Sequence, residues 1–64
     1  MIVNGVSHDI DEPLSVADVI ELLGIEARGV AVAVNGEIAS RSQWSQTWVQ
    51  TSDVVEIVTA AAGG

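Results

Sequence analysis

Two Asn-Gly dipeptides constrain the fold of this chain more than any other sequence feature. Asn4-Gly5 lies between apolar residues near the start, and Asn35-Gly36 follows the alternating segment of residues 30–34. Both central positions of a type I′ turn need positive φ, which Asn and Gly tolerate, so each dipeptide predicts a β-hairpin. We therefore expect a chain built on a sheet.

The strands around these turns are expected to be short. The first hairpin joins residues 2–3 to residues 6–9, after which acidic residues and a proline break the pattern and make a loop. The second hairpin joins residues 30–34 to a return strand at residues 37–39, which we expect at an edge of the sheet. His8 has no second His and no Cys to support a metal or nucleophile role, so an ordinary exposed or edge position is expected.

One amphipathic helix is predicted between the hairpins. Ser15 is the expected N-cap, Asp18 completes a capping box, and Leu14 can pack on Val19 across the first turn. Gly24 is expected to end the helix as its C′ residue. Apolar residues at i, i+3, i+4 and i+7 form one stripe that should pack on a face of the sheet: Val16, Val19, Ile20 and Leu23.

Residues 40–50 show no clean period but hold both tryptophans of the chain. Trp44 and Trp48 have the i, i+4 spacing of a single helical turn. Each could be an aromatic plug that seals the end of a small core, or an anchor for a partner protein. We favour the plug for Trp44 and leave the role of Trp48 open.

The last strand is predicted at residues 54–59, after a turn at residues 51–53, and is expected to be buried. It runs without a breaker into residues 60–64, which read Ala-Ala-Ala-Gly-Gly. Such residues bury too little apolar area to order themselves, so we expect a domain of residues 1–59 and a flexible tail of residues 60–64. Fully extended, the tail reaches about 17 Å, far enough to carry the carboxylate of Gly64 into another protein.

Together, five strand segments and one helix predict a single α+β domain. We expect a mixed sheet of four to five strands with the helix packed across one face. The last strand should lie inside the sheet beside the first, so that the tail leaves the domain from a firmly held element.

Composition narrows the classes of function. Nine acidic residues against two arginines give a net charge of −7, which disfavours nucleic acid and favours a basic protein surface as partner. The same charge could also serve only to keep a small apolar domain soluble. The absence of cysteine excludes a disulfide framework, a thiolate metal site and a thiol that could carry sulfur. No membrane-spanning run or basic leader is seen, so a cytoplasmic location is expected.

Six segments spread over nearly the whole chain carry a resemblance to a known family: Asn4-Gly5, residues 22–25 (LLGI), residues 30–36 (VAVAVNG), residues 41–44, residues 53–58 and the final Gly63-Gly64. In these segments the sequence resembles the ThiS family, the sulfur carrier proteins of thiamine (thiazole) biosynthesis. This resemblance implies a ubiquitin-like β-grasp fold. One departure from the family's pattern is Ser52, which stands where a turn glycine is usual and puts the conformation of that turn in question.

The resemblance implies a carrier and not an enzyme. The carboxylate of Gly64 would be adenylated by a ubiquitin-activating-type enzyme, converted to a thiocarboxylate by a sulfur donor protein, and used by thiazole synthase as its sulfur source. These partners would recognise Ala62 and Gly63 in the tail, because side chains at the glycines would crowd the approach to the terminal carbonyl. ATP belongs to the activating enzyme, and this chain is expected to bind no cofactor or metal itself.

Other interpretations stay open. MoaD, the small subunit of molybdopterin synthase, also ends in Gly-Gly, but it is usually longer and commonly carries proline and valine where this chain has Ala60, Ala61 and Ala62. A ubiquitin-like modifier would join Gly64 to a lysine of a target protein. A ubiquitin-like binding domain would carry the glycines incidentally. An acyl carrier protein is disfavoured, because the chain has neither its phosphopantetheine serine motif nor an all-helical pattern.

Overall fold

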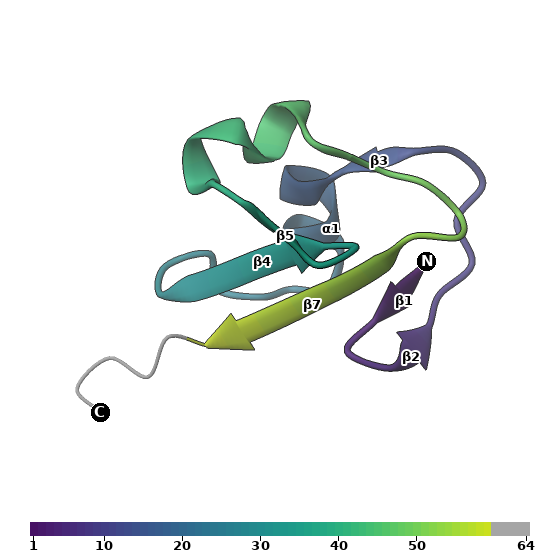
Figure 1. Cartoon of the computed structure of the whole chain (residues 1–64), viewed down its shortest axis with the longest axis horizontal. Coiled ribbons are helices and arrows are strands. Elements are labelled where there is room, and N and C mark those ends of the chain that lie inside the picture. The colour runs from purple at the N-terminus through teal and green to yellow at the C-terminus, as the bar shows by residue number, and fades with distance from the viewer. Residues whose placement is uncertain (60–64) are drawn as a thin grey trace.

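A mixed five-stranded sheet forms the centre of the molecule, with its strands in the order β2-β1-β7-β4-β5. The computed structural model describes residues 1–59, and Figure 1 shows the α-helix and a 3₁₀ helix on the same side of this sheet. The predicted α+β fold is confirmed. The elements of this body are β1 (Ile2–Val3), β2 (Val6–Ser7), α1 (Val16–Leu22), β4 (Val30–Val34), β5 (Glu37–Ala39), the 3₁₀ helix η1 (Arg41–Gln46) and β7 (Val54–Thr59).

The predicted tail, residues 60–64, lies outside the described residues, and so do its Ala62, Gly63 and Gly64. The division into a domain of residues 1–59 and a flexible tail therefore stays a prediction.

The hydrophobic core lies between the sheet and the two helices. Each buried apolar side chain contributes about 1.5–3 kcal/mol before its conformational entropy is subtracted, so a small set of well-packed residues must hold the domain. Strands, helices and the first residue all contribute to this set: Met1, Val3, Val16, Val19, Ile20, Val32, Trp44, Val49, Val55 and Ile57.

Both Asn-Gly dipeptides form the predicted hairpin turns. Asn4 and Gly5 have φ values of 51° and 83°, and Asn35 and Gly36 have 51° and 85°. These positive values at both central positions are those that a type I′ turn requires. The first hairpin is shorter than predicted, because β2 ends at Ser7 instead of near residue 9.

The helix begins and ends as its sequence predicts. The Asp18 N–H donates to Ser15 Oγ at 3.0 Å, and the Ser15 N–H donates to Asp18 Oδ2 at 3.4 Å, which completes the capping box. At the other end Gly24 has a φ of 66°, and its N–H donates to the Glu21 carbonyl, while the Ile25 N–H reaches the Ile20 carbonyl. These two bonds form a Schellman motif. No helix within residues 1–59 is both long and apolar enough to cross a membrane.

The last strand lies inside the sheet beside the first, as predicted. It runs parallel to β1, with Ile2 opposite Val54, and antiparallel to β4, with Val30 opposite Thr59. The expectation that the whole strand is buried was wrong, because strand residues alternate between the two faces of a sheet. Val55 and Ile57 are buried, whereas the other four residues are exposed.

A second, two-stranded sheet was not predicted. β3 (Leu14–Ser15) pairs antiparallel with β6 (Trp48–Val49), so that Ser15 is both the N-cap of α1 and the partner of Trp48. The placement of the two tryptophans on one helical turn was therefore wrong. Trp44 lies in η1, and Trp48 lies in β6.

Trp44 is the plug that the sequence predicted. Its side chain is only 6% exposed, and its indole N–H donates to the carbonyl oxygen of Ala39 at 2.9 Å. This bond satisfies the one polar group that a buried tryptophan carries. The Trp48 side chain, by contrast, is 55% exposed.

The asparagines of both turns also bind β7 through their side chains. Asn4 Nδ2 donates to the Ile57 carbonyl at 2.9 Å, and Asn4 Oδ1 accepts from the Ile57 N–H at 2.8 Å. Asn35 Oδ1 accepts from the Val54 N–H at 2.9 Å, and the Asn35 N–H donates to the Val54 carbonyl at 2.7 Å. Each amide therefore lengthens the pairing of β7 beyond the end of a neighbouring strand.

We predict that Asn4→Gly destabilises the domain by about 1–3 kcal/mol, because glycine keeps the positive φ of the turn but leaves both polar backbone groups of Ile57 without the amide. Urea unfolding monitored by tryptophan fluorescence measures this loss, since burial of Trp44 is lost when the chain unfolds. Asp11→Gly, in the exposed loop after β2, adds an equally flexible residue and should cost less than about 0.5 kcal/mol. Equal unfolding midpoints for the two variants would show that the Asn4 side chain has no such role.

Candidate functional site

The candidate site is the end of β7 from which residues 60–64 continue. Val58 pairs with Ala31 and Thr59 pairs with Val30, so β7 stays paired with β4 up to its last described residue. The sequence predicted that the tail leaves from an interior strand, and the sheet order confirms the position of that strand. The predicted site residues themselves, Ala62, Gly63 and Gly64, lie outside the described residues.

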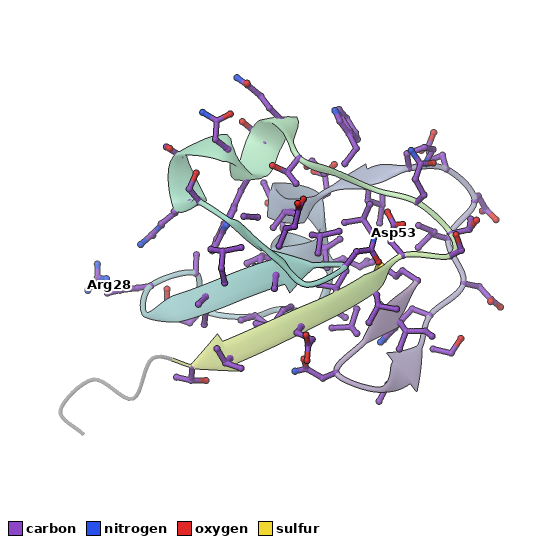
Figure 2. The ribbon with its side chains drawn as sticks, in the orientation of Figure 1. Arg28 and Asp53 are labelled. Atoms are coloured by element: carbon purple, nitrogen blue, oxygen red, sulfur yellow. The ribbon has the colours of Figure 1, made fainter. Side chains whose placement is uncertain are left out.

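Two charged residues mark opposite ends of the sheet (Figure 2). Arg28 lies in the loop before β4, at the end of the sheet where β7 finishes, and its side chain is directed away from the body of the domain. Asp53 lies at the opposite end, immediately before β7 begins. Arg28, one of the two arginines of this acidic chain, therefore lies at the end of the sheet where β7 finishes.

The face of the sheet that turns away from the helices is exposed and mostly apolar, with Glu56 as a charged residue on it, and we call it the outer face. Alternation along β7 directs Val58 and Glu56 to this face, and the registers of β4 and β5 add Ala31, Ala33 and Ile38. Ile38 is 74% exposed and Val58 is 59% exposed. Because alanines lie between larger side chains, these residues line a shallow hollow of about 210 Å³.

An apolar surface of this kind is typical of a protein-binding site, since exposed apolar side chains that cluster gain free energy when a partner covers them. The sequence did not predict it. The alternation in residues 30–34 indicated a strand, but not which face of that strand the helix would leave uncovered.

Asp53 organises the turn that precedes β7. Its Oδ1 accepts from Asn35 Nδ2 at 3.0 Å, and its Oδ2 accepts from the Gln50 N–H at 2.8 Å. The hydrogen bond from Asn35, followed by that from Gln50, holds the pKa of the Asp53 carboxyl below its usual value. Ser52, at the position where the resemblance leads one to expect glycine, is not among the residues with positive φ, so this turn needs no glycine there.

His8 lies at the end of the first hairpin and is half-buried, in keeping with the ordinary position expected for it. Its backbone N–H donates to the Met1 carbonyl, and its carbonyl accepts from the Met1 amino group. Within residues 1–59, no three His, Cys, Asp or Glu side chains come together in a way that could hold a metal ion.

A mixed five-stranded sheet with its last strand in the interior and a helix across one face defines a ubiquitin-like β-grasp domain. The model of the ThiS family matches residues 1–64 of this chain. The chain therefore belongs to the ThiS family.

Solved structures agree with this assignment. The crystal structure of the thiamine biosynthesis protein ThiS from Geobacter metallireducens superposes with a TM-score of 0.87 and 33% identity, and the match covers 98% of this chain and 96% of that one. A solution structure of a thiamine biosynthesis protein from the same organism gives a TM-score of 0.73 and 32% identity, over 89% of this chain and 77% of that one.

Two sequence relatives match this chain over very different shares of their own length. A thiazole synthase of Paramagnetospirillum magneticum is 33% identical over 64 residues, which are all of this chain but 20% of that protein. The chain thus spans about a fifth of that relative. The uncharacterized protein ycf40 of Porphyra purpurea is 27% identical over 62 residues, which are 97% of this chain and 87% of the relative.

The hydrogen bonds of Asp53 predict a specific loss of stability in acid. A carboxyl whose folded pKa is lowered stabilises the fold above its unfolded pKa, near 3.8, and this contribution is lost as the pH falls through the lower folded value. The difference in unfolding free energy between the wild-type chain and Asp53→Asn should therefore be constant near neutral pH and shrink below 3.8.

Urea unfolding at a series of pH values measures this difference. Asp9→Asn removes the same charge from an exposed residue whose carboxylate accepts no hydrogen bond from another of residues 1–59, and so controls for net charge. A gap between wild type and Asp53→Asn that is independent of pH would contradict the assignment.

Proposed function

We propose that this protein carries sulfur as a thiocarboxylate on Gly64 and delivers it for thiazole formation in thiamine biosynthesis. The observation that carries the proposal is that β7, the interior strand of a ThiS-family domain, is followed directly by the sequence Ala-Ala-Ala-Gly-Gly. A paired interior strand is a firm base from which a short chain segment can be presented to another protein.

The chemistry begins at a carboxylate, which is a poor electrophile. A carboxylate oxygen of Gly64 attacks the α-phosphorus of ATP, pyrophosphate leaves, and a mixed anhydride with AMP forms. Sulfide supplied by a sulfur donor protein then attacks the carbonyl carbon, and the bond to AMP breaks as AMP leaves with its electron pair. The product is a thiocarboxylate, a nucleophile that can pass its sulfur to thiazole synthase.

The chain acts in this scheme as a substrate and not as a catalyst. It has no cysteine on which to hold sulfur, and the ATP belongs to an adenylating enzyme of the ubiquitin-activating type. Ala62 and Gly63 are the residues that this enzyme recognises next to Gly64, because glycine allows a close approach of the partner's backbone. A thiazole synthase relative with a segment similar to this whole chain supports thiazole synthase as a second partner.

The outer face is where the adenylating enzyme docks in this proposal. Val58 belongs to that face and lies next to the last described residue of β7, so a partner that covers the hollow also meets the segment that follows. Ile38 and Val58 supply the apolar contact, and the charge of −7 favours a partner with a basic surface around it.

Intact mass spectrometry tests the carrier role directly. After incubation with ATP, the adenylating enzyme and a sulfur donor, the protein should gain the mass difference of one oxygen replaced by sulfur. Deletion of Gly64 should abolish this change yet leave the urea midpoint of unfolding unaltered, because the buried core described is built from residues 1–57. A covalent adduct to a protein lysine would instead indicate a modifier, and no modification at all would favour a binding domain.

Docking through the outer face is tested with Ile38→Asp. Loss of this apolar side chain, with a second carboxylate added to a hollow that already holds Glu56, should raise the KM for the carrier in the adenylation reaction about tenfold and leave kcat unchanged. Leu22→Asp, a matched change at a 64% exposed residue at the end of α1, should alter neither constant. Equal effects of the two variants would place the docking surface elsewhere.

A further inference from the structure

A groove next to the edge strand β5 has no role in the scheme above. It has a volume of about 480 Å³ and lies between the turn after β4, the strand β5, the 3₁₀ helix η1 and the residue before β7. Trp48 lines this groove together with Glu37, Asp53 and Ile38. An exposed aromatic ring and two carboxylates thus share one concave surface.

The exposure of Trp48 follows from the fold itself. Its neighbour Val49 is fully buried in the core, and alternation along β6 therefore directs the indole outward. The backbone of Trp48 is held opposite Ser15, which is itself fixed as the N-cap of α1. A large apolar ring is in this way presented on an ordered strand, where it is 55% exposed.

Two acidic residues make the lining of the groove negatively charged. The Asp53 carboxylate is held in place by the Asn35 side chain and the Gln50 N–H, and each of its oxygens can still accept a further bond. Glu37 adds a second negative charge. Neither of the chain's two arginines, Arg28 and Arg41, lines this groove.

A guanidinium group matches these features better than other cations. It is planar and stacks on an indole face, and its fixed fork of donors bonds carboxylates, whereas an ammonium group is a compact, strongly hydrated charge. The chain contains such an arrangement elsewhere: the Arg41 guanidinium lies over the ring of Trp44, at 5.9 Å from its centroid.

We propose that this groove receives an arginine side chain of the protein that docks on the outer face. The two surfaces are continuous, because Ile38 lines both the groove and the apolar hollow that contains Val58. A partner seated on the hollow therefore reaches Trp48 around the edge strand β5. The identity of that partner rests on the proposed function, whereas the preference of the groove for arginine does not.

Heteronuclear NMR of the isotope-labelled full chain tests this preference with three capped tripeptides, Gly-Arg-Gly, Gly-Lys-Gly and Gly-citrulline-Gly. The arginine peptide should shift the Trp48 indole and the amides around the groove, and it should bind more tightly than the lysine peptide. Citrulline has the same shape without the charge and should produce almost no shift. Shifts spread over the whole acidic surface, or equal binding of the arginine and lysine peptides, would overturn the proposal.

Two variants then separate the ring from the charge. Trp48→Leu keeps an apolar side chain but removes the indole face, and should weaken binding of the arginine peptide about two- to fivefold. Glu37→Gln should weaken it as well, while Glu21→Gln, the same change on α1, should not. An unchanged signal of the Trp44 indole N–H, which bonds Ala39, shows that each variant is folded.

Unaltered affinity in both Trp48→Leu and Glu37→Gln would also overturn the assignment. None of these measurements uses ATP or the carboxylate of Gly64. A groove that does not bind arginine would therefore leave the carrier function standing, and a failure of the sulfur transfer would leave the groove's preference intact.

Discussion

Hydrogen bonds to β1, to β4 and to two asparagine side chains hold β7 at the centre of the sheet, and the other elements pack around it. β1 supplies only two residues to this strand, and β4 ends at a tight turn, so neither neighbour alone satisfies the full length of its backbone. The side-chain amide of Asn4 pairs with both polar groups of Ile57, and Asn35 binds the backbone of Val54. The strands beside β7 are short, but the turn asparagines add hydrogen bonds to its backbone beyond the ends of these strands. A small domain can therefore hold an interior strand firmly.

The small size of the domain leaves one face of the sheet uncovered. One helix and a 3₁₀ turn can cover only one face of the sheet, so the alternating side chains of β4, β5 and β7 leave an apolar outer face beside the end of β7. Exposed apolar area of this kind favours aggregation, and a net charge of −7 opposes it by repulsion between copies. For the proposed function, these two properties suit a carrier that binds basic, partly apolar partners and is then released from them.

Local chemistry made much of the fold predictable. The Asn-Gly turns, the capping box of Ser15, the C′ glycine at Gly24 and the interior position of the last strand were all derived from sequence and are confirmed. The pair β3 and β6 escaped prediction because a strand of two residues has no period to detect. Because β6 was not predicted, the i, i+4 spacing of Trp44 and Trp48 suggested one helical turn. In the structure η1 ends between the two residues, and Trp48 belongs to β6.

The turns, the helix caps and most strand segments could be predicted from the residues alone, and the charge and the Gly63-Gly64 pair are read directly from them. These depend on the backbone preferences and side-chain groups of adjacent residues. Three features could be seen only in the folded domain. The amides of Asn4 and Asn35 bind β7, Ile38 and Val58 lie on an uncovered face, and Trp48 shares a groove with Asp53. Such contacts join residues far apart in the chain, and they arise only when packing has fixed which face of each strand the helices cover.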